Sequence, residues 1–116
     1  MNSYQLISKD ELKRQIDAST YFKLVMCLGD WHFMAKHIPG SIHIDSLSRA
    51  DSLRLAVEQL QPNDEIVVYC ADKDCAASKM GYLLLVDNGY NNVRRFAGGI
   101  GEWEEAGYPL DGRMAG

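Results

Sequence analysis

The spacing of apolar and polar residues along the chain predicts strands that alternate with helices. Short, mostly apolar runs predict strands at residues 22–27, 41–44, 65–70 and 92–96. Helical spacing predicts helices that begin at Ser8, at Ser48 or Asp51, and at Cys75, and a last helix around Trp103. A short helical turn is expected from Asp30 through Ala35, and Asp30 could cap it. The run at 65–70 is apolar and β-branched, as expected for a central parallel strand. This order is typical of an α/β domain with a mostly parallel sheet.

Local signals mark several ends of these elements. Ser8 and Glu11 have the S-x-x-E spacing of a capping box. Pro62 follows the helix that carries Leu53, Val57 and Leu60 at helical spacing and is expected to end it. Gly89 stands where a left-handed residue ends the helix predicted over residues 75–88.

Composition and charge narrow the class of protein. The chain has 116 residues, 47% of them hydrophobic and 24% charged, which is the balance of one globular domain. We therefore expect a single domain over residues 1–116, with a core at about 5–112 and a tail at 113–116. The net charge of −4 argues against a nucleic-acid-binding surface. No apolar run is long enough to span a membrane and residues 1–5 do not resemble a secretory signal, so we expect a soluble, cytoplasmic protein.

A cysteine ends the best strand. Ligands of open α/β sheets bind beyond the carboxyl ends of the strands, and Cys70 lies there, just before a loop and a helix. Backbone amides and a helix N-terminus favour negative charge, so we expect an acidified, nucleophilic thiol. The alternative is a buried cysteine of the core. Cys27 ends a neighbouring strand at the same edge and is expected to be a core residue, with redox work as the alternative.

Five short motifs resemble those of the single-domain rhodanese family and occur in the family's order. They are the turn HIPGSI at 37–42, the strand IVVYC at 66–70, G-Y-x-x-V at 89–93, G-G-x-x-x-W at 98–103 and the ending GYP at 107–109. Together they extend over nearly the whole chain, from about residue 5 to 112. The resemblance implies a rhodanese-like α/β fold, with a central, mostly parallel five-stranded sheet flanked by helices on both faces.

The resemblance also implies a chemistry. Cys70 would form a persulfide and pass its sulfane sulfur to a thiol or a cyanide-type acceptor, which makes the protein a sulfurtransferase or sulfur carrier. The donor would be a small-molecule or protein-bound sulfane sulfur. From the charge, hydropathy and cysteine spacing of the chain we expect no metal, nucleic acid or membrane to take part, and no cofactor is expected. The family loop after the cysteine directs its amides at the persulfide, and its positions here are Ala71, Asp72, Lys73, Asp74 and Cys75.

The sequence departs from the family pattern in two places. Residues 26–28 read MCL where many members have Asp-Val-Arg, and Cys75 replaces the usual arginine five residues after the nucleophile. The loop holds Lys73 between Asp72 and Asp74, so its formal charge is negative. A negative loop repels a dianion. We therefore expect thiosulfate to be a poor donor and persulfides to be better ones.

Cys75 has two interpretations. It is either a small residue at a helix start or a resolving thiol that attacks a Cys70 persulfide, forms a disulfide and releases sulfide. The C-x4-C spacing fits no strong zinc pattern. Elsewhere, His37 is expected to form structural hydrogen bonds, Trp31 and His32 to line the cleft, and Trp103 to lie in the core.

Two other functions compete with sulfur transfer. A phosphatase or arsenate reductase of related fold needs the spacing C-x5-R to bind its oxyanion, but position 76 is alanine and no arginine lies between Cys70 and Arg94. A binding or redox-regulatory module would keep the rhodanese fold without efficient turnover. The missing charged residues favour such a module, and the retained Cys70 argues against it.

Overall fold

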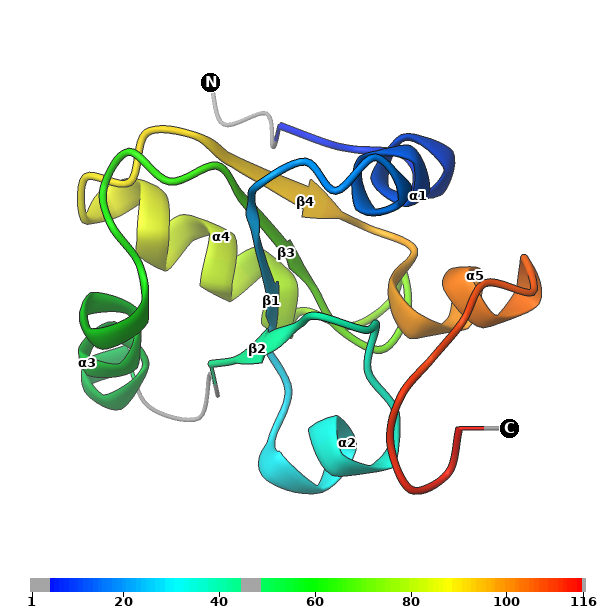
Figure 1. The fold of residues 1–116 in the computed structure, drawn as a ribbon. Helices are drawn as coiled ribbons and strands as arrows, with labels where there is room; N and C mark the ends of the chain where they lie inside the picture. Colours follow the sequence, from blue (N-terminus) through cyan, green and yellow to red (C-terminus); the bar gives the residue numbers. More distant parts are fainter. Residues whose placement is uncertain (1–4, 45–48, 116) are drawn as a thin grey trace.

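The computed structural model describes residues 5–44 and 49–115 and has an α/β architecture (Figure 1). In chain order the elements are α1 (Lys9–Asp17), β1 (Lys23–Met26), α2 (Asp30–Ala35), β2 (Ile42–His43), α3 (Arg49–Gln59), β3 (Ile66–Tyr69), α4 (Ala77–Asp87), β4 (Val93–Phe96) and α5 (Gly99–Glu105). The candidate helix start at Ser48 lies outside the described residues. In the described part of the chain, no helix is long and apolar enough to cross a membrane.

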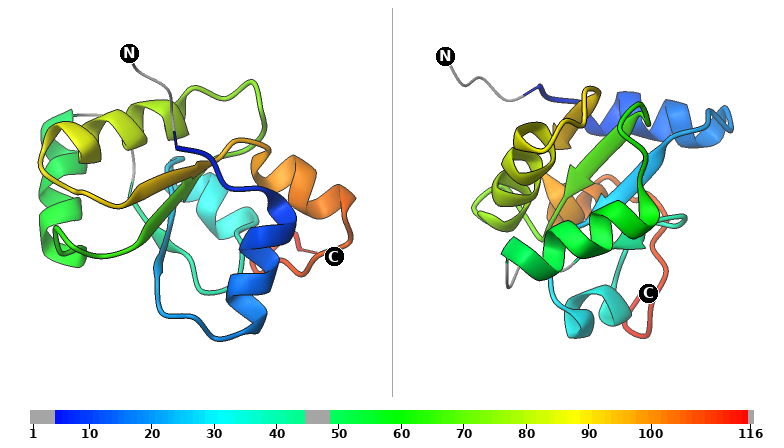
Figure 2. Two further views of the ribbon diagram at one scale, coloured as in Figure 1. Left: turned by 90° about the horizontal axis from the view of Figure 1, so that it is seen from above. Right: turned by 90° about the vertical axis from the view of Figure 1, so that its left-hand side faces the viewer.

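The strands form one parallel sheet in the order β2-β1-β3-β4. Strand β3 lies between β1 and β4, and all four of its residues are buried. Figure 2 shows α3 and α4 on one face of the sheet and α1 and α5 on the other. The fold class expected from the sequence is confirmed, and it brings the carboxyl ends of β1 and β3 together at one edge.

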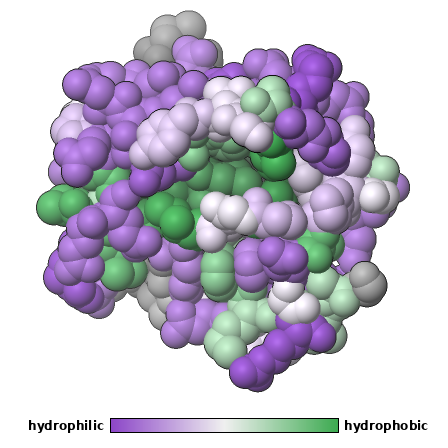
Figure 3. All heavy atoms as spheres, in the orientation of Figure 1, coloured by the Kyte–Doolittle hydropathy of each residue, from purple (hydrophilic) through white to green (hydrophobic). Residues whose placement is uncertain are grey.

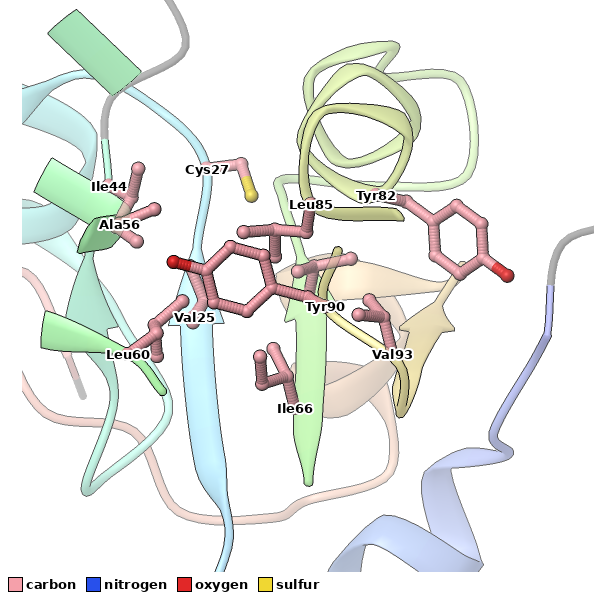
Figure 4. Packing of buried hydrophobic residues seen from close by; sticks show 11 residues of the cluster. Val25, Cys27, Ile44, Ala56, Leu60, Ile66, Tyr82, Leu85, Tyr90 and Val93 are labelled. Carbon is pink, nitrogen blue, oxygen red and sulfur yellow. The ribbon is translucent and has the colours of Figure 1, made fainter. Parts of the chain in front are cut away.

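Each face of the sheet has its own hydrophobic cluster. On one face Leu60, just after α3, and Leu85 of α4 pack against strand residues such as Val25 (Figure 4). On the other face Leu12 of α1 and Trp103 of α5 pack against β1 and β3. Trp103 is fully buried, as expected. On the outside, Figure 3 shows mostly hydrophilic residues around a hollow whose floor is apolar.

The sheet has four strands where the sequence analysis expects five. At the outer edge of β4, Leu6 forms a single parallel bridge with Arg95. The Ile7 amide donates to the Arg95 carbonyl at 3.1 Å, and the Arg95 amide donates to the Gln5 carbonyl at 2.7 Å. This stretch stays short because Ser8 caps α1 immediately afterwards, accepting a hydrogen bond from the Glu11 amide.

The helix ends and faces differ from expectation in detail. Helix α4 begins at Ala77 rather than Cys75 and ends before Gly89, whose φ of +90° is left-handed as expected. Gly29, not Asp30, is the N-cap of α2. In α3 the buried residues are Ser52 and Ala56, and Leu60 is buried just after the helix, whereas Val57 is 63% exposed. Helix α3 therefore packs through small residues that a count of large apolar side chains misses.

Candidate active site

Cys70 follows β3, and the residue before it fixes the end of the strand. The Tyr69 hydroxyl accepts a hydrogen bond from the Ile38 amide at 2.9 Å and lies 2.6 Å from the Ser41 Oγ. Residues 37–41 thus bind directly to the strand that carries the cysteine. His37 donates from Nδ1 to the Phe33 carbonyl at 2.7 Å and stacks on the Phe33 ring, which is the structural role expected for it.

The N-terminus of α5 packs against the backbone on the other side of Cys70. The Ile100 amide donates to the Cys70 carbonyl at 3.0 Å, and the Gly101 amide donates to the Ala71 carbonyl at 2.8 Å. Gly99 has a φ of +63°, and a Cβ there would lie 2.3 Å from the Cys70 carbonyl oxygen. Gly99 is therefore needed for this close approach as well as for its left-handed φ.

The Cys70 sulfur lies among polar groups from the loop and from α4. Its thiol donates to the Cys75 carbonyl, with Sγ 3.4 Å from the oxygen, and Sγ is also 3.4 Å from the Ser78 Oγ. The Ser78 backbone amide also hydrogen-bonds to this sulfur. The first turn of α4 therefore faces the sulfur, as the strand–loop–helix order predicts.

The thiol is not acidified in this structure, contrary to expectation. Cys70 is 1% exposed. This burial raises the pKa of the Cys70 thiol, a hydrogen bond with the Cys75 side chain raises it further, and the hydrogen bonds from Ser78 lower it. Burial dominates because an anionic sulfur loses its hydration there.

The loop amides explain part of this difference. The Asp74 amide donates to the Asp72 carboxylate at 2.9 Å, and the Cys75 amide donates to the Asp72 carbonyl at 3.2 Å. An aspartate at the start of a turn captures following amides in this way. At Asp74 and Cys75, the predicted arrangement of amides aimed at the sulfur is therefore wrong for this state. The side chains of Asp72, Lys73 and Asp74 are exposed.

All three cysteines are free thiols, but their environments differ. Cys27 is 2% exposed and belongs to the hydrophobic cluster shown in Figure 4. Its sulfur packs against Gly81 of α4, where a Cβ would lie only 2.7 Å away. Burial raises the pKa of the Cys27 thiol, so Cys27 is a core residue. Cys75 is partly exposed, and its side chain contacts the Cys70 thiol.

A pocket of about 290 Å³ opens beside the cysteine loop. Its wall is mainly apolar and is formed by Met26, Leu28, Trp31, His32, Ala35, Lys36, Ala71, Asp72, Ile100, Gly101 and Met114. Trp31 and His32 therefore line the cleft, as expected. Met114 belongs to the segment expected to be a tail, but its amide donates to the Ala35 carbonyl at 2.9 Å. The end of the chain thus packs on α2 and helps to build the pocket.

Sequence reasoning missed two residues of the site. Ser78 is fully buried, and its Oγ accepts a hydrogen bond from Nε of Arg95 at 2.9 Å. Arg95 comes from β4 and is 5% exposed. The signal was present in the sequence: successive side chains of a strand point to opposite faces, so one of Arg94 and Arg95 had to face α4.

Comparison with known proteins decides the family. The family model of the Rhodanese-like domain matches residues 8–106. The chain belongs to the rhodanese-like family. Across the residues that the structure describes, no group of three or more His, Cys, Asp or Glu side chains is placed to hold a metal ion.

Several solved structures have the same fold as this rhodanese-like chain. A protein from Bacillus halodurans superimposes with a TM-score of 0.83 at 19% identity, over 97% of this chain and 80% of that one. The rhodanese-like domain of an Anabaena protein superimposes with a TM-score of 0.82 at 21% identity, over 97% of this chain and 82% of that one. A thiosulfate sulfurtransferase from Pseudomonas aeruginosa superimposes with a TM-score of 0.77 at 22% identity, over 97% of this chain and 22% of that one. At these identities the likeness shows the fold alone.

One relative has a higher sequence identity than these structures and is named as a transcriptional regulator. An HTH-type transcriptional regulator from Mycobacterium tuberculosis is 34% identical over 105 residues. The match covers 90% of this rhodanese-like chain and 44% of the regulator, so this chain spans less than half the length of that relative.

Proposed function

We propose that this rhodanese-like protein is a sulfurtransferase or sulfur carrier in which Cys70 forms the persulfide. The observation that carries the proposal is the position of its sulfur. It lies at the carboxyl end of the central strand and faces the first turn of α4 through the Ser78 amide. The next residue, Ala71, lines the pocket. Amide donors at a helix N-terminus stabilise an anionic sulfur, which is the species both half-reactions need.

The reaction has two balanced displacement steps. The Cys70 thiolate, its proton lost to solvent, attacks the outer sulfur of a persulfide donor. The donor's S–S bond breaks, its thiolate leaves with the bonding pair, and a Cys70 persulfide remains. A thiolate or cyanide acceptor then attacks the terminal sulfur, and the Cys70 thiolate leaves. This is ping-pong covalent catalysis, and it requires no net oxidation or reduction.

The charge of the loop and the lining of the pocket support an organic persulfide as the donor. Asp72 and Asp74 outnumber Lys73 on the exposed loop surface, so a dianion such as thiosulfate approaches against a negative field. The pocket wall offers mainly apolar side chains such as Met26 and Ile100. Such a wall binds the carbon skeleton of a low-molecular-weight or protein-bound persulfide.

Turnover with cyanide as acceptor tests the proposal. Thiocyanate formation is measured with glutathione persulfide and with thiosulfate, for the wild type and for Cys70→Ser and Cys75→Ala. We expect wild-type turnover, faster with the persulfide, that Cys70→Ser abolishes and Cys75→Ala retains. Turnover that survives in Cys70→Ser would place the chemistry elsewhere.

A second candidate is a redox-regulatory role. Its support is the relative named as a transcriptional regulator and the contact between the Cys70 and Cys75 thiols. In this role Cys75 attacks the inner sulfur of the Cys70 persulfide. A Cys70–Cys75 disulfide forms, and the terminal sulfur leaves as hydrosulfide with the electron pair. The disulfide, rather than a transferred sulfur, is then the output.

A further inference from the structure

A buried arginine reaches the Cys70 sulfur through one hydroxyl group. The Ser78 Oγ lies 3.4 Å from the Cys70 Sγ and 2.9 Å from Nε of Arg95. Ser78 is 0% exposed and Arg95 5% exposed. Ser78 comes from α4, Arg95 from β4 and Cys70 from the position after β3, and the three side chains form a continuous hydrogen-bonded chain inside the protein.

The two neighbouring arginines of β4 have different environments. Arg94 faces the surface and bonds to Glu11 at 3.2 Å, Gln15 at 2.6 Å and Glu65 at 2.7 Å. Arg95 faces inward, and its backbone is fixed by the bridge to Leu6. Burying a guanidinium is costly, because the charge loses its hydration. A buried arginine that donates to the serine beside the candidate nucleophile therefore points to a role at the sulfur.

We propose that Ser78 and Arg95 act as a positioning pair that stabilises the anionic sulfur of Cys70, as thiolate and as persulfide. This inference rests on the proposed function only for the persulfide; the thiolate part stands by itself. Arg95 also supplies a positive charge from β4. In the loop, Cys75 stands in place of the family's usual arginine.

The hydrogen-bonding capacity of a hydroxyl explains how the pair works. The Ser78 Oγ has two lone pairs and one proton, and one lone pair is used by Nε–H of Arg95. In the resting thiol, the single S–H proton is donated to the Cys75 carbonyl, and the Cys70 Sγ lies 3.4 Å from the Ser78 Oγ. When the sulfur loses its proton, the Ser78 hydroxyl rotates and donates to the anion. A hydroxyl that already accepts from a cation is the stronger donor, so the pair lowers the pKa of Cys70 against the effect of burial.

Other groups around Cys70 act in the opposite direction or through the backbone. Cys27, which follows β1, and Cys75 of the loop are thiols whose ionisation would oppose that of Cys70. Helix α5 donates the Ile100 amide to the Cys70 carbonyl, not to the sulfur. The charged loop residues Asp72, Lys73 and Asp74 are exposed, and their interactions with the sulfur are screened by water.

The pH profile of Cys70 alkylation tests the pair without any sulfur donor. Iodoacetamide modification of Cys70 is followed by peptide mass mapping, in a Cys75→Ala background so that the partly exposed thiol does not compete. Ser78→Ala and Arg95→Gln are compared with Arg95→Lys and with Arg94→Gln, the matched control on the same strand. The midpoint of the profile is the readout, because limited access to a buried sulfur changes the rate at every pH but not the midpoint.

We expect Ser78→Ala and Arg95→Gln each to shift the midpoint of the profile to higher pH. Alkylation at neutral pH should slow about tenfold, which corresponds to a rise of about one unit in the pKa of Cys70. Arg95→Lys should restore part of the loss, and Arg94→Gln should leave the midpoint unchanged. The double variant should be no worse than Ser78→Ala alone, because Arg95 acts through the hydroxyl.

An unchanged midpoint in folded Ser78→Ala overturns the proposal and leaves the pair a purely structural role. That variant removes one hydroxyl and keeps the backbone, so it remains decisive even where Arg95→Gln unfolds. The result is separate from the proposed function: a shifted midpoint without sulfur transfer rejects only the sulfurtransferase, and transfer with an unshifted midpoint rejects only the pair.

Discussion

Gly99 lies against the carbonyl group of Cys70, and a Cβ at this glycine would be 2.3 Å from the carbonyl oxygen. The next amide, that of Ile100, donates to the same oxygen at 3.0 Å. Two segments far apart in the sequence therefore meet backbone to backbone at the candidate nucleophile. The G-G-x-x-x-W motif places its helix against the strand that carries the cysteine.

This contact predicts a strong effect for Gly99→Ala. Alanine at a left-handed φ costs about 1–2 kcal/mol, and here the new methyl group also meets the backbone after Cys70. Gly107→Ala is the matched control, since Gly107 has a φ of +78° and nothing within 4 Å of its Cβ position. We expect Gly99→Ala to lower both the urea midpoint and the rate of sulfur loading clearly more than the control does. Equal losses in the two variants would show that the contact with Cys70 is unimportant.

The Tyr69 hydroxyl is predicted to hold the turn at residues 37–41 on the end of β3. Tyr69→Phe leaves the Ile38 amide, now bonded to that hydroxyl at 2.9 Å, buried and without its acceptor. An unsatisfied buried group costs about 1–3 kcal/mol. Urea unfolding of Tyr69→Phe should show a loss of this size. Tyr108→Phe, which removes a hydroxyl bonded to the exposed Asp10, should have a much smaller effect, and a similar effect of both would contradict the assignment.

The direction of the Cys70 pKa predicts an alkaline pH profile for sulfur loading. The thiolate is the nucleophile, and burial raises the pKa of Cys70 above that of an ordinary thiol. Loading should therefore still increase with pH beyond neutrality, instead of reaching a plateau in mildly acidic solution. Stopped-flow or quenched loading with glutathione persulfide measures this profile. A plateau already complete at pH 6 would show that the sulfur is anionic in the resting protein.

Cys75 is predicted to influence that profile as well as to compete for the persulfide. The hydrogen bond with its side chain raises the pKa of Cys70, so Cys75→Ala should move the loading profile to lower pH. The same variant should lose any disulfide formed after persulfide treatment. Non-reducing peptide mapping checks for a Cys70–Cys75 bond. An intramolecular disulfide that persists in Cys75→Ala would join Cys70 to Cys27, and the resolving role of Cys75 would be wrong.

Backbone-level features of this fold were predictable, because they depend on residues close in sequence. The apolar run before Cys70 specified a central strand, and Gly89 specified the left-handed end of α4. Trp103 was also expected in the core, where it lies. A strand and the helix after it fix where Cys70 lies, whatever the surrounding side chains do.

Side-chain chemistry at the site was not predictable to the same extent. The capture of the Asp74 amide by the Asp72 carboxylate is a choice of turn conformation within the loop. The contact of Arg95 with Ser78 depends on which face of β4 turns toward α4. The ionisation of Cys70 depends on how deeply the loop and α4 bury it. Each of these is set by tertiary packing, which short sequence patterns do not specify.

The most direct test of the central claim is the intact mass of the protein after incubation with glutathione persulfide. We expect a gain of one sulfur atom that cyanide removes, that is absent in Cys70→Ser and that is smaller with thiosulfate as donor. The same gain in Cys70→Ser, or no change in mass with either donor, would contradict the claim that Cys70 carries the sulfur.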